Sequence, residues 1–409
     1  MAAGWLPSGQ KRAIFAGMHR LLRVVGGSFG LLVVSASCGS SSDGGTTPNE
    51  PGSASSAGTS TGGKSNNLGG DPSTPVGGAS RSNDGGATPG AAATAGVGMA
   101  GEASGGASAV DPCPQGGCFQ SCSGLTGKEC QGESCCEALP VEGGTFEQGE
   151  PDAFSSTLDA FALDKYEVSV ARFRNFVNAY DAWLADAQPS AGAGANAHVP
   201  DSGWQAAWSA SLAPDAAALK AKLACGHGND TWAETGNDAL PITCVDWYTA
   251  FAFCVWDGGR LPTDAEAEYA AVGGSRDSRY PWGDTPELTN EQDETAAYAV
   301  YHCLADGSGS GQACTPGDLL PVGSKPAGKG HYQHLDLVGS VWEWALDGWQ
   351  ENYPATAQTN YAKLHAEKFR TMRGGCWDST AKLAHGASRS GLTPITNYDQ
   401  VGIRCARNL

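Results

Sequence analysis

The sequence predicts a loop-rich α+β domain that is held together by disulfides and preceded by a disordered tether. The chain of 409 residues contains 14 cysteines, and most of its tryptophans lie in the C-terminal half. Three short helical patterns are separated by long stretches rich in Gly, Pro, Asp and Trp, which is typical of loops packed on buried aromatics. No aromatic residue occurs between Phe29 and Phe119, so this region cannot bury enough apolar surface to fold.

Charge and cysteine content exclude some function classes. Lys and Arg number 25 against 43 Asp and Glu, which gives a net charge of -18. Such a chain repels phosphate backbones, so we expect no nucleic-acid partner. Many cysteines after a secretion-like N-terminus indicate an oxidising compartment in which thiols are paired.

Residues 1–38 predict a signal peptide with a lipobox. Basic residues precede a short apolar run from Leu21 to Ala36, and small residues follow it up to Cys38. The run is too short and too rich in glycine to predict a membrane-spanning helix. A cysteine at this place resembles a bacterial lipidation site, although Ser35 stands where an aliphatic residue is usual. Simple secretion and a start at Met18 remain alternatives to a lipid anchor in the membrane, on the outer membrane or the cell surface.

Residues 39–110 consist mainly of Gly, Ser, Thr, Ala, Asn and Pro. Ordering such a segment costs conformational entropy that its side chains cannot offset. We expect a disordered linker that tethers a folded head to the anchor.

Residues 111–139 predict a small cysteine-rich module with a structural role. Six cysteines crowd this segment, and the sequence does not choose among their pairings: Cys113, Cys118, Cys122, Cys130, Cys135 and Cys136. A zinc site is the alternative, but the paired C-x-x-C ligands that usually build one are absent from this segment. Disulfides are therefore favoured by the compartment.

Residues 140–409 predict the folded head, whose size suffices for one sizeable core. An apolar stripe runs from Val170 to Tyr180 at helical spacing, and a second runs from Trp247 to Val255. Thr263 and Glu266 form a capping-box pattern at the start of a third helix. Short antiparallel strands are expected near the C-terminus.

Five ordered motifs resemble the sulfatase-modifying-factor family, named for the formylglycine-generating enzyme. They are GGRLPTDAE at 258–266, YPWG at 280–283, DLVGSVWEW at 336–344, RGG at 373–375 and GIRC at 402–405. The resemblance implies a C-type-lectin-like fold for residues 140–409. Ala267 and Ser340 depart from the residues usual in the family. We expect these two departures to affect side-chain packing more than membership of the family.

The family's oxidase members convert a substrate cysteine to formylglycine with O2, using two cysteines that bind Cu(I). A linear Cu(I) site requires two soft thiolates. The matching positions are Ser379 and Ala384, so copper is not expected. Cys376 lies three residues early as a weak catalytic candidate beside Ser379, and a buried free thiol or an atypical disulfide is the favoured alternative.

The resemblance also implies a disulfide between Cys254 and Cys405. Close spacing favours two more bridges, Cys225 with Cys244 and Cys303 with Cys314. Cys376 is then the unassigned cysteine of the head.

Oxygen-rich motifs resemble the family's calcium loop. The expected ligands of a structural calcium ion are the carboxylates of Asp336 and Glu343 and the carbonyls near Gly339 and Val341, with Asn290 in a second site. Local capping or salt bridges by the two carboxylates are the alternative.

The resemblance places Trp342, Trp377 and Arg389 around a substrate groove. The favoured alternatives are core packing for the tryptophans and a buried ion pair for Arg389. The leading hypothesis is a tethered, non-oxidase module that binds a protein or glycan ligand or acts as a scaffold. The alternative is an oxidoreductase that forms formylglycine with O2. A hydrolase is not predicted, because the folded head, residues 140–409, contains no G-x-S-x-G elbow.

Overall fold

The computed structural model describes residues 119–126, 130–150, 153–187, 189–307, 314–366 and 368–409. The predicted signal peptide with Cys38, the linker 39–110, Cys113 and Cys118 lie outside this part. The described head has an α+β fold with little regular secondary structure, as expected. None of its helices is both long and apolar enough to cross a membrane.

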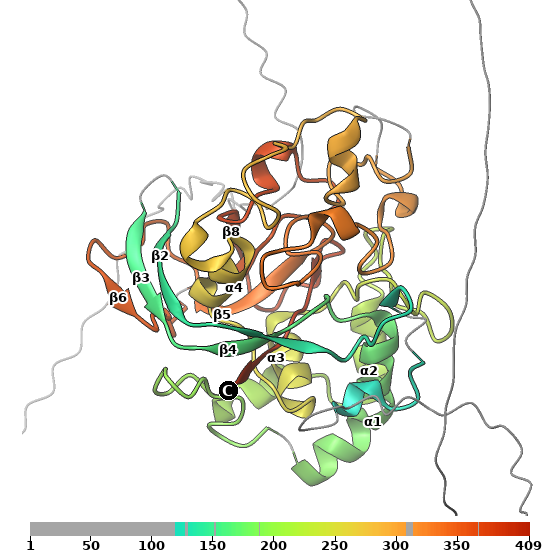
Figure 1. Ribbon diagram of the computed structural model, residues 1–409. Helices are drawn as coiled ribbons and strands as arrows, with labels where there is room; N and C mark the ends of the chain where they lie inside the picture. The colour runs from blue at the N-terminus through green and yellow to red at the C-terminus, as the bar shows by residue number, and fades with distance from the viewer. Residues whose placement is uncertain (1–118, 127–129, 151–152, 188, 308–313, 367) are drawn as a thin grey trace, which may run out of the picture. The chain divides into compact units, whose positions relative to one another are not determined.

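Three small sheets form the strand framework of the head (Figure 1). The first has the order β1-β4-β10, with β1 Ala138–Val141, β4 Phe161–Asp164 and β10 Ala406–Asn408. The second has the order β2-β3-β6, with β2 Gly144–Gln148, β3 Phe154–Leu158 and β6 Gln358–Thr359. The third has the order β8-β7-β5-β9, with β5 Trp342–Gly348, β7 Arg370–Arg373, β8 Arg389–Leu392 and β9 Val401–Gly402.

The third sheet carries two of the sequence motifs side by side. Strands β5 and β7 are antiparallel, with Glu343 opposite Arg373, whereas β9 pairs with β5 in parallel. All residues of β5 and β7 are buried. The sheet therefore anchors the loop that follows Arg373.

Both apolar stripes form the predicted helices. Helix α1 Val170–Ala187 buries Val170, Phe173, Val177 and Tyr180 completely. Helix α3 Trp247–Trp256 is buried over nearly its whole length and packs in the same core. Asp246 caps α3 by accepting a hydrogen bond from the Thr249 amide at 2.7 Å.

The predicted capping box starts helix α4 Asp264–Ala271. The Thr263 hydroxyl accepts from the Glu266 amide, and the Glu266 carboxylate accepts from the Thr263 amide. Glu266 also forms a buried ion pair with Arg260 at 2.7 Å. The fourth α-helix in the described part, α2 Ala216–Leu223, has no counterpart among the sequence predictions.

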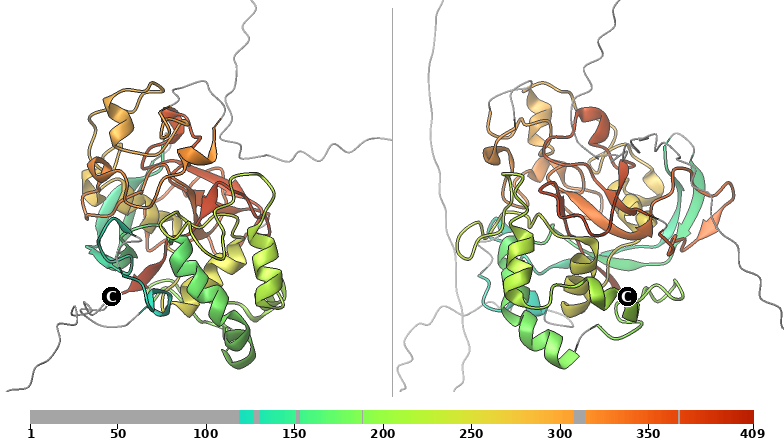
Figure 2. Two further views of the ribbon diagram at one scale, coloured as in Figure 1. Left: turned by 90° about the vertical axis from the view of Figure 1, so that its right-hand side faces the viewer. Right: turned by 180° about the vertical axis from the view of Figure 1, so that it is seen from behind.

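The remaining connections are loops and short 3-10 turns. The loops that follow α4, coloured yellow to orange, gather at one end of the head, away from α1 and α2 (Figures 1 and 2). Their turns are η4 Gly274–Arg276, η5 Glu294–Ala297, η6 Pro316–Asp318 and η7 Pro326–Gly328. Elsewhere lie η1 Gln120–Cys122, η3 Ala206–Ser211 and η8 Ala381–Leu383.

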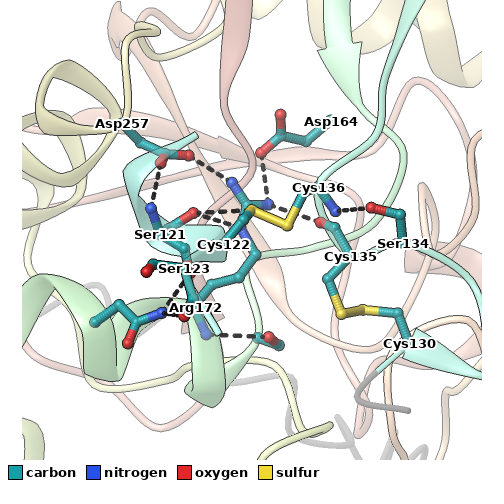
Figure 3. Close-up of a disulfide and its surroundings, with 12 residues drawn as sticks. Ser121, Cys122, Ser123, Cys130, Ser134, Cys135, Cys136, Asp164, Arg172 and Asp257 are labelled. Atoms are coloured by element: carbon teal, nitrogen blue, oxygen red, sulfur yellow. Dashed lines mark hydrogen bonds and ion pairs between the residues drawn. A yellow bond between two sulfur atoms is a disulfide. The ribbon is translucent and has the colours of Figure 1, made fainter. Parts of the chain in front are cut away.

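The described part of the cysteine-rich segment packs on the head. Strand β1 spans the predicted boundary at 139/140 and pairs with β4. Disulfides Cys122–Cys136 and Cys130–Cys135 close the segment, and the Ser121 amide donates to Asp257 at 2.8 Å (Figure 3).

Candidate functional site

The loop 374–384 follows β7 and contains the positions that the family resemblance assigns to copper. Gly374 and Gly375 have φ of 95° and 81°, a conformation that favours glycine. A Cβ on Gly375 would lie 2.8 Å from the Leu383 carbonyl oxygen. These two glycines therefore turn the chain back beneath the sheet.

Backbone hydrogen bonds fix the loop on two neighbouring segments. The Trp377 amide donates to the Ser340 carbonyl at 2.8 Å, and the Cys303 amide donates to the Trp377 carbonyl at 2.9 Å. The His302 amide donates to the Ser379 carbonyl at 2.9 Å. These bonds attach the loop to residues 302–303 and to Ser340.

Neither copper position offers a thiolate. Ser379 and Ala384 are both 0% exposed. The Ser379 hydroxyl accepts a hydrogen bond from the Cys376 amide at 2.8 Å, while Ala384 presents a methyl group. A hydroxyl and a methyl group cannot hold Cu(I) as two thiolates would.

Of the two alternatives for Cys376, weak catalytic candidate or buried cysteine, the structure bears out a buried, disulfide-bonded cysteine. Cys376 is disulfide-bonded, and its Sγ lies 3.2 Å from a carboxylate oxygen of Asp378. A sulfur in a disulfide is neither a thiolate nucleophile nor a thiolate metal ligand. Its atypical bridge was one of the alternatives open from the sequence.

Acidic residues beside Cys376 escaped the sequence analysis. Burial, then the nearby charge of Asp399, raises the pKa of Asp378 to about 7. Gln400 Nε2 donates to Asp378 at 2.6 Å, and Asn229 Nδ2 donates to Asp399 at 3.1 Å. No motif signals this group, because its members come together only in the fold.

The proposed groove residues do not form an exposed groove. Trp342 and Trp377 are each 3% exposed and belong to the main core cluster. The Arg389 guanidinium lies 3.9 Å from the Tyr353 ring centroid and 4.6 Å from that of Trp349, a cation–π arrangement. For the tryptophans the core-packing alternative is correct, and Arg389 stacks on rings instead of forming the buried ion pair.

The expected calcium residues surround an arginine. Arg404 is fully buried and pairs with Glu343 at 2.7 Å. Asp336 accepts from the Gly323 amide at 2.6 Å, and burial raises its pKa to about 6. Glu167, which the sequence analysis did not single out, accepts from the Ser340 hydroxyl and the Val341 amide.

Two of the expected calcium ligands already have protein partners. Glu343 pairs with Arg404, and Asp336 accepts from the Gly323 amide. Asn290 accepts from the Ala381 amide at 2.7 Å, so its side-chain oxygen holds the loop 374–384. Within the described ranges no three His, Cys, Asp or Glu side chains are grouped to hold a metal ion.

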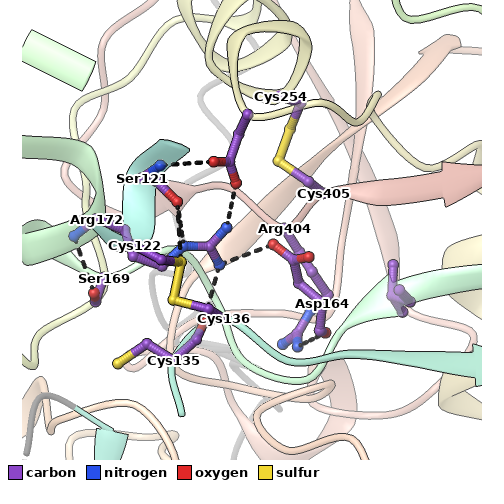
Figure 4. A network of polar contacts seen from close by, with 12 residues as sticks. Ser121, Cys122, Cys135, Cys136, Asp164, Ser169, Arg172, Cys254, Arg404 and Cys405 are labelled. Carbon is purple, nitrogen blue, oxygen red and sulfur yellow. Dashed lines mark hydrogen bonds and ion pairs between the residues drawn. A yellow bond between two sulfur atoms is a disulfide. The ribbon is translucent and has the colours of Figure 1, made fainter. Parts of the chain in front are cut away.

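The head contains the three disulfides that the sequence analysis paired. They are Cys254–Cys405, Cys225–Cys244 and Cys303–Cys314. The first joins α3 to the last motif across 151 residues of sequence (Figure 4). Disulfides on this scale indicate an extracytoplasmic protein.

A surface hollow of about 140 Å3 lies between β2 and α4. The charged residues of its lining are four acids and one arginine: Glu147, Glu150, Glu268, Asp277 and Arg279. Burial raises the pKa of Glu268 to about 7, even though Arg373 pairs with it. No sequence motif singled out Glu268 as a site residue.

Comparisons with known proteins agree with the motifs. A family model described as sulfatase-modifying factor enzyme 1-like domain matches residues 123–409. The formylglycine-generating enzyme of Streptomyces coelicolor is 31% identical over 301 residues, which cover 69% of this chain and 87% of the relative. That of Bos taurus is 29% identical over 300 residues, 66% of this chain and 74% of the relative.

Two further similarities differ in kind. A mouse protein named inactive C-alpha-formylglycine-generating enzyme 2 is 33% identical over 172 residues, 41% of this chain and 49% of the relative. The solved structure of PvdO from Pseudomonas aeruginosa matches with a TM-score of 0.45 and 20% identity, covering 69% of this chain and 97% of that one. The relatives thus include proteins named as formylglycine-generating enzymes and proteins named as inactive.

Proposed function

Because the chain belongs to the sulfatase-modifying factor enzyme 1-like family, we propose from its copper positions that it is a non-oxidase member. In this proposal the head is a binding or scaffolding module of the cell envelope. The observation that carries it is the replacement of both copper thiolates by Ser379 and Ala384, each fully buried. The disulfide state of Cys376 supports it, because every cysteine in the described ranges is disulfide-bonded and none offers a thiolate in compensation.

A direct assay separates this proposal from formylglycine formation. The purified protein is loaded with Cu(I) and incubated with O2 and cysteine-containing peptides, one of them taken from a sulfatase. We expect no O2 uptake above the copper-only background and no peptide aldehyde by mass spectrometry. An aldehyde product that requires the protein would overturn the proposal and favour the oxidoreductase.

The proposed ligand is a protein or a glycan, and the surface proposed to bind it is the hollow between β2 and α4. This hollow beside Glu268 is the proposed binding surface because its lining carries several charged side chains. Four carboxylates and one arginine favour a cationic group, such as a lysine or arginine side chain of a partner protein. Saturable binding of a lysine-rich peptide that Glu268→Gln abolishes would support this surface, whereas equal binding by the variant would eliminate it.

Two features support the proposed location in the cell envelope, the disulfides of the head and the lipobox-like sequence at Cys38. The disulfides favour an extracytoplasmic head, and the lipid anchor at Cys38 is proposed from the lipobox-like sequence. Incorporation of labelled palmitate in a bacterial host should be lost in Cys38→Ser. Equal labelling of both chains would contradict the anchor.

Calcium is proposed from the family rather than from the site geometry. One feature favours a cation: three buried carboxylates, Glu167, Asp336 and Glu343, face the single guanidinium of Arg404. A rise in Tm with CaCl2 over EDTA that disappears in Asp336→Asn would support calcium there. An unchanged Tm would contradict calcium binding at this cluster, and Arg404 would then be the only positive charge that balances its carboxylates.

A further inference from the structure

Two acidic side chains at the loop 374–384, Asp378 and Asp399, lie close together without a basic partner among the described residues. Asp399 is only 5% exposed, and Asp378 is half-buried. Burial and then the negative charge of Asp399 raise the pKa of Asp378, and no described Lys or Arg opposes them. By contrast, the buried Asp257 and Glu266 each pair with an arginine at 2.7 Å. Two buried acids without a counter-charge favour the binding of a cation.

Two amide side chains adjoin these acids. Gln400 Nε2 donates to Asp378 at 2.6 Å, and Asn229 Nδ2 donates to Asp399 at 3.1 Å. Gln400 is 6% exposed, and its Oε1 has no hydrogen-bond partner in the part of the chain that the structure describes. Because Nε2 of the same amide contacts Asp378, this unpartnered oxygen lies beside the acids. A buried amide oxygen is normally bonded, so it points to a ligand. Asp378, Asp399, Asn229 and Gln400 are called the Asp378 cluster below.

We propose that the Asp378 cluster is a binding site for Ca2+. Calcium takes about six to eight oxygen ligands from carboxylates, amide carbonyls and water, and the cluster offers two carboxylates and two amides. The two carboxylates balance the charge of one divalent ion. Softer metal ions are not favoured, because the neighbouring sulfur of Cys376 is in a disulfide and is no thiolate ligand.

The ion would join three loops that are distant in sequence. Asn229 lies between α2 and α3, Asp378 lies between β7 and β8, and Gln400 directly precedes β9. Asn229 and Asp378 are half-buried, so the cluster is open to solvent on their side. Bound Ca2+ would therefore hold the loop 374–384 to two other segments of the head.

This site is distinct from the calcium loop that the family resemblance implies. It shares no residue with the cluster of Asp336, Glu343 and Arg404, in which an arginine already pairs with a carboxylate. Two carboxylates are a low charge count for a calcium site, so we expect a Kd on the order of 10⁻⁴ to 10⁻³ M, as in extracellular modules. The inference goes beyond the proposed function and does not depend on it.

Equilibrium dialysis of the EDTA-treated full chain against radioactive Ca2+ tests the site. The dialysis is run at about pH 8, because a proton on Asp378 would compete with the ion. Asp378→Asn and Asp399→Asn should each weaken the binding of one Ca2+ per chain by at least ~10-fold, since each removes one of two charged ligands. Asp336→Asn and the exposed Glu351→Gln should retain this ion at wild-type affinity.

Gln400→Glu separates a lost ligand from a damaged fold. It places a third carboxylate where the unpartnered Oε1 lies, and it should tighten the binding of this Ca2+ about 10-fold. Unfolding cannot produce a tighter site, so this variant decides the matter even if an aspartate variant fails to fold. Near-UV circular dichroism establishes which variants are folded.

Three results would overturn the inference. The first is a wild-type chain that binds no Ca2+ in the millimolar range. The second is wild-type affinity in folded Asp378→Asn and Asp399→Asn. The third is binding that Asp336→Asn abolishes and Gln400→Glu leaves unchanged, which would assign the ion to the other cluster.

Discussion

The side chains of Ser379 and Ala384 are both fully buried in a loop that backbone hydrogen bonds hold in place. A hydroxyl remains protonated at neutral pH, and a methyl group has no lone pair to donate. Neither can replace an anionic sulfur as a ligand of a soft monovalent ion. In the proposed non-oxidase member, the loss of copper binding is thus a property of two residues in a scaffold that the chain retains.

Asp378 gives the same loop a measurable pH dependence. Its pKa is raised to about 7 from a usual 3.8 by burial and by Asp399, so the folded state holds the proton to higher pH than the unfolded state. The stabilisation from this group is fully present below about pH 4 and is lost as pH rises through about 7.

Asp378→Asn removes this dependence, because an amide does not ionise. The difference in free energy of unfolding between variant and wild type should change by about 2 to 4 kcal/mol from pH 4 to pH 8, in favour of the variant. Urea unfolding at several pH values measures it, with the exposed Glu351→Gln as a control that follows wild type. Parallel profiles for wild type and Asp378→Asn would refute the role of Asp378.

At the scale of elements, Arg172 of α1 connects the cysteine-rich segment, β4 and α3. Its guanidinium pairs with Asp164 at 2.9 Å and with Asp257 at 2.7 Å, and its Nε donates to Ser121 (Figure 4). All three ion-pair residues are buried. Charges taken out of water in this way depend on each other for compensation.

Arg172→Met should therefore lower the free energy of unfolding by about 3 to 5 kcal/mol, since Arg407 alone would face two buried carboxylates. Arg174→Met is the matched control on the same helix. Its partner Asp238 is half exposed, so we expect a loss of less than about 1 kcal/mol. Urea denaturation of both variants provides the comparison, and equal losses would show that the buried network has no special weight.

Elements with strong local signals could be predicted from the sequence. The stripes of α1 and α3 and the capping box of α4 are encoded within a few residues, and the structure confirms them. Helix α2 carries an alanine-rich sequence without a distinct apolar face, so periodicity did not reveal it. The predicted domain boundary at 139/140 falls inside strand β1, because the amino-acid composition changes there. In the structure the residues on both sides of this boundary pair with β4.

At the scale of the whole molecule, the ordered motifs predicted the α+β fold and the family, but the side-chain environments were not predictable. Whether Trp342 lines a groove or fills the core depends on what packs over it in the fold. The cluster of Glu167, Glu343 and Arg404 joins residues that lie far apart in sequence. Local spacing carries no information on such contacts. The sequence therefore carried no signal for Glu167 and left open whether the tryptophans line a groove or fill the core.

The head as a whole retains a scaffold that two substitutions should return to copper binding. In Ser379→Cys/Ala384→Cys the family's pair of thiols stands again on the loop 374–384. The double variant should bind one more Cu(I) ion per chain than the wild-type protein does. Each single variant should bind no additional tightly held ion. A double variant equal to wild type would show that the loop no longer has the required geometry.

Anaerobic titration of the wild-type protein with Cu(I), against a coloured chelator that competes for the ion, tests the central claim most directly. The account predicts that the wild-type head withdraws no copper from the chelator, while the double variant withdraws one equivalent. Withdrawal of a full equivalent by the wild-type chain, with its disulfides intact, would contradict the account.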